Sequence, residues 1–325
     1  MYWRIPTRTK KQTKLSATPC ALVNTRPRKS EIQAGLASGT PVRFLMTFLA
    51  VASLLQPSAL VSATLSPVTP AANAQIASNQ ALRNQAAQLF QMGNQARAAQ
   101  GLRPLEWDAA LAAAALNHCV RVASEGPLSH QYAGEPDLSE RAGQAGAHFS
   151  LIEENIAVGP QPGTIHQAWM NSPGHRENLL SPEVDRVGIA VLARGNQLYA
   201  VADFGHGVAV LTQQQVEAKV ANMVEATGLA AHGSSDGARE ACALDHGLPA
   251  LLDSRRPEFI MRWQDAELQR LPGALLDRIA TGKYHEAAVG SCPSQSADAT
   301  FTVYRVAVLL LRPVAAATHT YLSQR

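Results

Sequence analysis

Apolar residues recur at helical spacing in the part of the chain that precedes residue 125. The spacing predicts a first helix over residues 80–99, and Gly101 is expected to end it. Asp108 is the expected N-cap of a second helix, because its side chain can accept hydrogen bonds from free backbone N–H groups. The apolar face of that second helix consists of Leu111, Ala115, Cys119 and Val122. We therefore expect this face to lie in a core.

The stretch that follows predicts short helices and then a hairpin. Residues 138–143 and 164–170 are expected to be helical, and residues 152–159 to form a short strand or a turn. The runs 186–193 and 197–205 are β-type, and an Arg-Gly-Asn turn separates them, so together they predict a β-hairpin. Helices followed by an antiparallel hairpin indicate an α+β fold or an α-β-α sandwich rather than a doubly wound sheet.

Residues 212–325 predict a second, smaller α+β domain. Thr212 and Gln215 have the spacing of a capping box, so a helix is expected from there to about Ala226. The polar and glycine-containing residues 230–240 are expected to be a flexible break.

Farther along this second unit, alternation and apolar runs predict strands. Phe259, Met261 and Trp263 alternate with other residues, which places them on one face of a strand. A helix is expected next, and two further strands after it, over residues 274–284, 286–292 and 301–311. The run that ends this unit is too short to span a membrane.

The N-terminus predicts a secretory signal segment over residues 1–63. Residues 44–55 are an uncharged apolar run of about 12 residues, which is too short for a mature membrane span. Arg43 precedes the run, and Val61 and Ala63 are the small residues of a cleavage site after Ala63.

Three further expectations concern this segment. Cleavage after Ala74 is a second possibility, and an uncleaved N-terminal anchor is the alternative to cleavage. The basic stretch before the apolar run is long, which a true start codon nearer Met46 would explain. Residues 64–78, rich in Ala, Ser, Pro and Thr, are expected to be a disordered linker.

The positive charge of the chain belongs to this leader. The 325 residues carry a formal net charge of +3, but residues 1–43 hold nine Lys and Arg against Glu31, or +8. The remainder therefore carries +3 minus +8, or −5. The basic excess is no argument for binding nucleic acid, and no nucleic-acid partner is expected.

Export changes the interpretation of the cysteines. Cys20 would leave with the signal segment, so three of the four cysteines remain, which allows one disulfide. Cys119 is expected on the buried face of its helix. Cys242 and Cys292 are then the natural pair in an oxidising compartment.

Four residues between 130 and 177 could carry chemistry: His130, Glu154, His175 and Glu177. Two imidazoles and a carboxylate on separate segments could form an open metal site or an acid–base group, although the spacing alone is a weak signal.

The motifs around these residues are far more specific than the residue types. The segments "GLRPLEWDAALAAAALNHCVRVA", "LSH", "ERAGQAG", "EENIA", "AWMNSPGHRENLL", "VGIAV" and "YAVADFG" occur in this order. They closely resemble bacterial members of the CAP superfamily, also called SCP domains, which includes cysteine-rich secretory proteins, antigen 5 and pathogenesis-related proteins. The resemblance covers residues 79–205 and sets a CAP domain at 79–206. It implies an α-β-α sandwich and secretion.

The resemblance also implies a shallow cleft lined by two histidines and two acids. His130 matches the first histidine, Glu154 the acid of the family's "GEN", and His175 the second histidine, in "SPGH". In some relatives the two imidazoles hold zinc or another divalent ion, so weak binding of such an ion by His130 and His175 is expected. Gly174 is expected to let the backbone turn so that His175 faces the cleft.

The chain departs from the family pattern in two places. Ser172 stands where the second acid is usual, and Glu177 is the candidate substitute. Glu153 replaces the glycine of "GEN", which is expected to raise a carboxyl pKa by repulsion with Glu154.

Structural roles remain open for each of these side chains. His130 could cap its loop, His175 could only pack at its helix start, and Glu154 could only bind backbone N–H groups. His118 is expected to be packed and hydrogen-bonded, and Ser172 to be an N-cap or turn residue.

Three functions therefore stay open. The favoured one is a secreted binding module for a lipid, an envelope component or a protein. The second is a metal-assisted hydrolase, in which His130, Glu154 and His175 activate a water. The third is a structural protein of the cell envelope.

Overall fold

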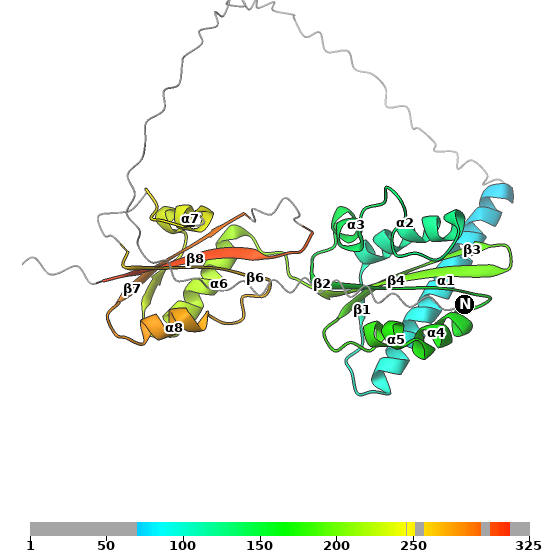
Figure 1. Cartoon of the computed structure of the whole chain (residues 1–325), viewed down its shortest axis with the longest axis horizontal. Coiled ribbons are helices and arrows are strands. Elements are labelled where there is room, and N and C mark those ends of the chain that lie inside the picture. The colour runs from blue at the N-terminus through cyan, green and yellow to red at the C-terminus, as the bar shows by residue number, and fades with distance from the viewer. Residues whose placement is uncertain (1–69, 245, 251–256, 294–299, 313–325) are drawn as a thin grey trace, which may run out of the picture. The chain divides into compact units, whose positions relative to one another are not determined.

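The computed structural model describes residues 70–244, 246–250, 257–293 and 300–312 (Figure 1). The signal segment expected at residues 1–63 lies outside the described residues, as does the start of the expected linker. Two four-stranded sheets organise the rest, and each has helices on both faces (Figure 1). The expected α+β class is confirmed.

The first sheet has the strand order β1-β3-β4-β2. β3 lies antiparallel to β4 and β4 antiparallel to β2, whereas β1 pairs parallel with β3. Its elements are α1 (Pro70–Ala98), β1 (Glu106–Trp107), α2 (Ala109–Glu125), α3 (Leu138–Gln144), β2 (Phe149–Gly159), α4 (Pro162–Asn171), α5 (Pro173–Leu179), β3 (Arg186–Arg194) and β4 (Gln197–Gly207). The expected hairpin of residues 186–205 is β3 and β4.

The helices form two layers around this sheet. α2 and α3 cover one face, and α1, α4 and α5 cover the other (Figure 1). Leu89 and Trp169 belong to the core of the second face, and Cys119 is buried in the core of the first. The predicted α-β-α sandwich is therefore the observed arrangement.

α2 begins and packs as its sequence dictates. The Asp108 carboxylate accepts hydrogen bonds from the backbone N–H groups of Ala110 and Leu111, which confirms the N-cap. The helix lies so close to β3 that a Cβ at Gly188 would come within 1.9 Å of the backbone nitrogen of Ala112. Only glycine fits there.

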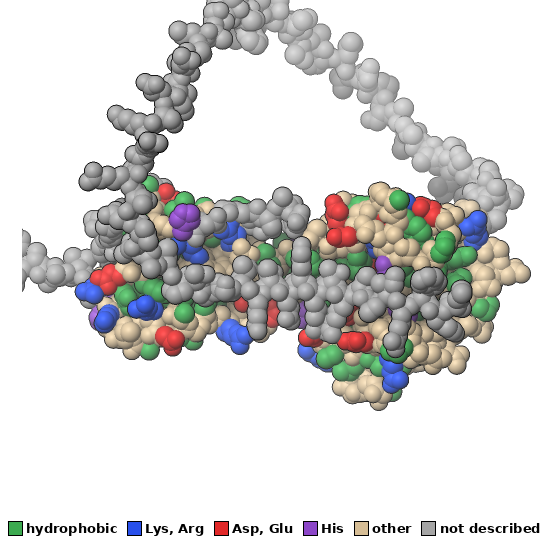
Figure 2. Space-filling model, viewed as in Figure 1, with side chains coloured by type: hydrophobic (Ala, Val, Ile, Leu, Met, Phe, Trp, Pro, Cys, Tyr) green, Lys and Arg blue, Asp and Glu red, His purple; other side chains and the backbone are tan. Residues whose placement is uncertain are grey.

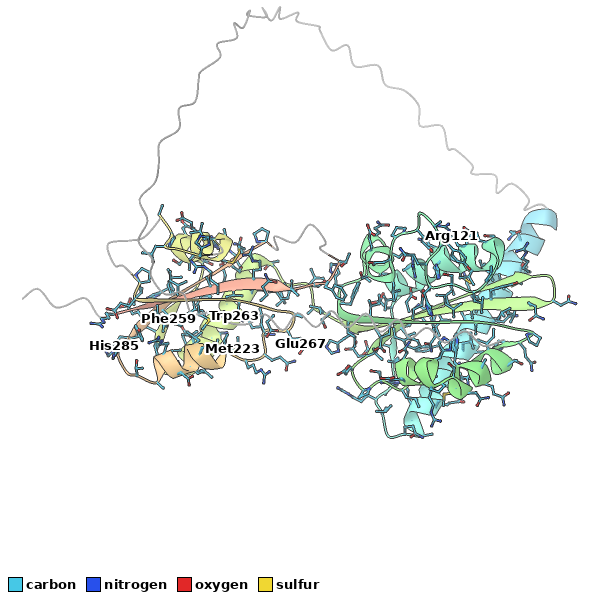
Figure 3. All side chains as sticks on the ribbon, in the orientation of Figure 1. Arg121, Met223, Phe259, Trp263, Glu267 and His285 are labelled. Atoms are coloured by element: carbon cyan, nitrogen blue, oxygen red, sulfur yellow. A yellow bond between two sulfur atoms is a disulfide. The ribbon has the colours of Figure 1, made fainter. Side chains whose placement is uncertain are left out.

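The second sheet has the order β5-β7-β8-β6. Its elements are α6 (Gln213–Glu225), β5 (Ala230–His232), α7 (Asp236–Ala243), β6 (Phe259–Asp265), α8 (Gly273–Ile279), β7 (Glu286–Cys292) and β8 (Tyr304–Leu311). The capping box of Thr212 and Gln215 is formed in both directions. Phe259 and Trp263 of β6 pack against the same core as Met223 of α6, as the alternation predicted (Figure 3).

The predicted disulfide is present. Cys242 at the end of α7 is bonded to Cys292 at the end of β7, with the two Cα atoms 5.7 Å apart. Cys119 is a buried free thiol, as expected.

Three local expectations were wrong. α1 begins at Pro70, so its first turns occupy residues that composition indicated to be linker; Ala-rich sequence has high helix propensity. Residues 230–240 are not a flexible break but contain β5 and most of α7, because Ser235 caps the helix and Ala238 is buried beneath it. Gly174 has no positive φ and lies in the first turn of α5, so the chain turns before Pro173.

Candidate functional site

Three of the four predicted residues come together at the β2 edge of the first sheet. His130 lies on the loop between α2 and α3, Glu154 near the middle of β2, and His175 in the first turn of α5. Asn155 holds α5 in place, because its side-chain amide donates to the backbone oxygen of His175 at 2.8 Å. Asn178 adds a hydrogen bond from α5 to the Asn155 side chain at 3.0 Å.

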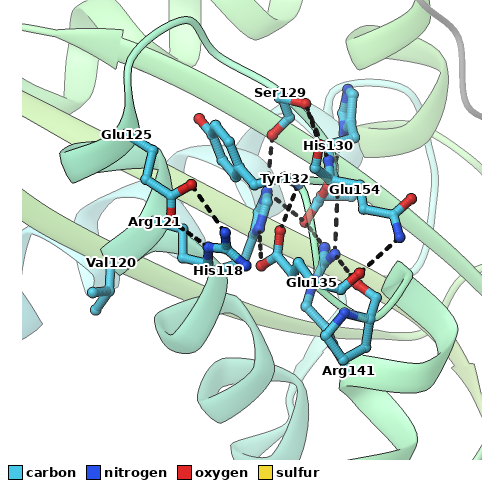
Figure 4. A network of polar contacts seen from close by, with 12 residues as sticks. His118, Val120, Arg121, Glu125, Ser129, His130, Tyr132, Glu135, Arg141 and Glu154 are labelled. Atoms are coloured by element: carbon cyan, nitrogen blue, oxygen red, sulfur yellow. Dashed lines mark hydrogen bonds and ion pairs between the residues drawn. The ribbon is translucent and has the colours of Figure 1, made fainter.

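His130 and Glu154 form the central contact of the site. The distance from His130 Nδ1 to Glu154 Oε1 is 2.7 Å (Figure 4). A carboxylate only accepts, so Nδ1 carries the proton and Nε2 of the neutral ring keeps its lone pair. The His130 side chain is 25% exposed whereas that of Glu154 is 1% exposed. A buried acid therefore orients an accessible imidazole.

Arg141 on α3 ties this pair to the fold, and sequence reasoning missed it. Its Nη2 lies 2.7 Å from Glu154 Oε2, and its Nη1 donates to the backbone oxygens of His130 and Pro136 (Figure 4). The sequence shows only an arginine on a predicted short helix after the loop of His130. Nothing in it indicates the contact with Glu154, which is 13 positions away.

The electrostatics of Glu154 differ from the prediction. Burial alone would raise the pKa of Glu154, but the hydrogen bond from His130 and the positive charge of Arg141 hold that pKa below its usual value. Repulsion does raise a carboxyl pKa in this site, but the group is Asp203 on β4. Burial, followed by the charge of Glu154, raises the pKa of Asp203 well above its usual range. Adjacent strand residues point to opposite faces, which separates Glu153 from Glu154.

The surroundings of His175 favour its neutral form. Burial lowers its pKa, and the proximity of His130 lowers it further. A neutral ring keeps a lone pair with which it can bind a ligand.

Glu177 and Ser172 do not join the cluster in the way the family pattern required. Glu177 is exposed on α5. It helps to line an open depression of about 540 Å³ whose other lining residues are Pro173, Arg176, Leu180, Ser181, Pro182 and Glu183. Ser172 occupies the N-cap position of α5, where its side chain makes no capping hydrogen bond.

A second buried network holds the loop that carries His130. His118 on α2 is fully buried, with Nδ1 at 2.7 Å from Glu135 Oε1 and Nε2 at 3.0 Å from the backbone oxygen of Ser129 (Figure 4). Glu135 also accepts from the backbone N–H of Tyr132. The expectation that His118 is packed and hydrogen-bonded is confirmed.

The metal prediction has partial chemical support. Two imidazoles lie near one another, but both oxygens of Glu154 already accept hydrogen bonds, from His130 and Arg141. Within the described ranges, no group of three or more His, Cys, Asp and Glu side chains is arranged to hold a metal ion. Zinc binding by His130 and His175 thus stays a prediction, with water or an exogenous ligand completing the coordination.

The comparisons with known proteins agree with these motifs. Residues 90–209 match the family model described as CAP, the cysteine-rich secretory protein family. This part of the chain is a CAP domain. The CAP domain is similar to YkwD of Bacillus subtilis, an uncharacterized protein, with 29% identity over 109 residues, 33% of this chain and 42% of that protein. It is also similar to the membrane protein YlbC of the same organism, with 30% identity over 105 residues, 32% of this chain and 30% of that protein.

Two solved structures are also similar to this chain in sequence. An extracellular SCP-domain protein of Bacillus anthracis is 27% identical, with a TM-score of 0.38, over 43% of this chain and 45% of that one. An outer surface protein of Borrelia burgdorferi is 25% identical, with a TM-score of 0.35, over 37% of this chain and 90% of that one. The chain spans less than half the length of the two Bacillus subtilis relatives.

Two surface properties bear on partners. Among the described residues, no helix is long and apolar enough to cross a membrane. On the face drawn in Figure 2, basic and acidic side chains are scattered and do not gather into one patch of a single sign.

Proposed function

We propose that the CAP domain is an exported binding module that captures an envelope lipid, another envelope component or a protein through His130 and His175. The observation that carries the proposal is the buried Arg141–Glu154 pair, which orients one accessible imidazole. Such an arrangement presents a hydrogen-bond acceptor or a metal ligand in a fixed direction while the charges that hold it stay out of water.

Export is part of the proposal. The apolar run at residues 44–55 and the small residues Val61 and Ala63 support cleavage after Ala63. The similarity to an extracellular protein and to an outer surface protein supports the same compartment. Sequencing the N-terminus of protein recovered outside the cytoplasm tests this, and mature soluble protein that retains Arg43 would contradict it.

Binding is tested by mass spectrometry of small molecules and proteins that copurify from the native host. We expect wild-type protein to retain a ligand that the double variant His130→Ala/His175→Ala loses. The variant His232→Ala is the control, because this imidazole is 63% exposed and lies on β5, in the second sheet. Equal recovery with the double variant would contradict binding through the cleft, and would favour a structural envelope role.

A metal-assisted hydrolase is the second candidate, and the His130–Glu154 contact is the observation that favours it. A carboxylate that fixes the Nδ1–H tautomer leaves the Nε2 lone pair free to hold a metal ion, which would activate a water. Turnover of an ester or peptide substrate that needs added Zn²⁺ and is lost in His130→Ala would support this candidate over binding alone.

A further inference from the structure

Asp203 lies directly opposite Glu154 across the β2–β4 pair, and opposite Gly188 across the β3–β4 pair. Side chains in such register share a face of the sheet, with Cβ atoms about 4.5–5.5 Å apart. That face is the one under α2, because α2 touches the backbone at Gly188. The two carboxyl groups are therefore neighbours between the sheet and α2.

The rows on either side of this pair are apolar. On β2 the same face carries Ile152 and Ile156, and on β4 it carries Val201, all of them buried. Asp203 itself has 0% exposure. A charged group here would have neither water nor polar neighbours beyond the Glu154 cluster.

Asp203 is also the member of this cluster that has no partner. Both of its carboxyl oxygens are buried, and neither has a hydrogen-bond partner within the part of the chain that the structure describes. The charged or titratable groups that act on it are Glu154 from β2, Arg141 from α3 and Cys119 from α2, and His118 of α2 lies 3.8 Å from Glu154 Oε2. The guanidinium of Arg141 is bonded to Glu154.

A neutral carboxylic acid resolves this arrangement. Protonated Asp203 has one O–H donor, and the acceptor beside it is Glu154. Each oxygen of Glu154 has two lone pairs, of which His130 and Arg141 use one apiece. A small rotation of the Asp203 side chain then supplies a third donor to the same carboxylate.

We propose that Asp203 is a positioning residue. It is a buried carboxylic acid whose O–H group donates a hydrogen bond to Glu154 and so fixes the carboxylate that orients His130. The assignment is independent of which ligand the CAP domain binds. It predicts that an amide can replace Asp203, because Asn has the same shape, stays neutral and keeps an N–H donor. A leucine cannot replace it, because leucine keeps the volume but has no donor.

The first test compares the stability of wild type and Asp203→Asn between pH 4 and pH 8. The unfolded chain ionises Asp203 above about pH 3.9, whereas the folded wild type keeps it protonated. The unfolding equilibrium constant of wild type should therefore rise about tenfold per pH unit relative to Asp203→Asn. Asp236→Asn is the control, since Asp236 is 80% exposed. Parallel curves for wild type and Asp203→Asn would overturn the proposal.

The second test reads the imidazole. We expect the side-chain nitrogen resonances of His130 to be the same in wild type and Asp203→Asn, and shifted in Asp203→Leu. Unchanged His130 resonances in folded Asp203→Leu would show that Asp203 only fills space, which overturns the positioning role. If Asp203→Leu does not fold, the infrared carbonyl band of a protonated acid decides. That band should be present in wild type at pH 7 and absent in Asp203→Asn.

Discussion

Glu154 in the CAP domain and Glu217 in the second unit are both buried carboxylates, but they are satisfied in different ways. Glu217 on α6 accepts two hydrogen bonds from Arg239 at 2.8 Å, and further bonds from the Ser234 hydroxyl and the Ser291 backbone N–H. Its partners join α6 to α7 and β7 and end there. A carboxylate satisfied in this way holds elements together.

Glu154 is instead part of a chain that leads to the surface. Arg141 of α3 is bonded to it, and the buried carboxyl group of Asp203 lies beside it. His130, its other partner, is partly exposed to solvent. Buried charge pairs are weak evidence of stability, because desolvation offsets their attraction. The contrast indicates that the buried pair of the second unit holds its helices and strands together, whereas the buried pair of the CAP domain orients His130.

Removing the arginine from each buried pair should have the largest effect on the free energy of unfolding, and the two losses should differ. Arg141→Met removes from the buried Glu154 anion the guanidinium bonded to its Oε2, so we expect a loss of about 3–5 kcal/mol in the free energy of unfolding. Arg239→Met should cost less, because Glu217 keeps its bonds from Ser234 and Ser291. Urea unfolding of both variants measures this, and equal losses would contradict the distinction.

Loss of the disulfide should act on the second unit. The double variant Cys242→Ser/Cys292→Ser opens a link between residues 50 positions apart. The chain-entropy model gives a cost of roughly 4 kcal/mol as an upper value. Unfolding of wild type with and without reductant measures the cost. The resonances of His130 should stay unchanged, and a shift in them would mean that the disulfide also supports the CAP cleft.

Acid should weaken both units through the two glutamates. Burial opposes ionisation, but hydrogen bonds and neighbouring charge lower the pKa of both Glu154 and Glu217. Their stabilisation is present above the unfolded value near pH 4.3 and is lost as pH falls through the folded value, by up to about 1.4 kcal/mol per pH unit for each group. Denaturation of Asp203→Asn protein from pH 7 to pH 3 measures this without the opposite pH dependence expected from Asp203. Glu217→Gln should flatten the curve, and an unaltered curve would contradict the assignment.

Zinc binding should be the smallest of these effects in free energy, and it tests only the cleft. We expect weak binding at pH 7.5 that fades toward pH 5.5, because ligand histidines must lose a proton. Burial lowers the pKa of His175, which favours the neutral ring that a metal ion needs. Calorimetry should show no binding by His175→Ala, at a stability cost of about 1 kcal/mol or less. Binding that survives in His175→Ala but is lost in the control His232→Ala would place the metal elsewhere.

Local patterns predicted much of the fold. Asp108 and the Thr212–Gln215 pair mark helix starts through contacts within three residues, and those starts are where the structure has them. The β3–β4 hairpin follows from two apolar runs and one turn. The pairing of Cys242 and Cys292 followed because export and the buried face of α2 left one choice.

The rest of the site depends on register, which a single sequence does not specify. Asp203 meets Glu154 only because β2 and β4 pair in one alignment, and a shift of one strand by one residue would put the two side chains on opposite faces of the sheet. Arg141 and Glu135 were missed for the same reason: their partners come from other segments. The sequence motifs identified His130, Glu154 and His175, but they did not predict the residues that hold these side chains in position.

The buried thiol of Cys119 has a consequence for how the disulfide of the second unit is protected. Burial raises the pKa of Cys119 to about 12, and its Sγ donates to the backbone oxygen of Tyr199 at 3.3 Å. Thiol–disulfide exchange needs a thiolate that can reach a sulfur atom. Once α2 has packed onto its sheet, Cys119 cannot attack the Cys242–Cys292 bond. Packing of α2 onto its sheet therefore keeps Cys119 out of the two alternative disulfides, with Cys242 and with Cys292.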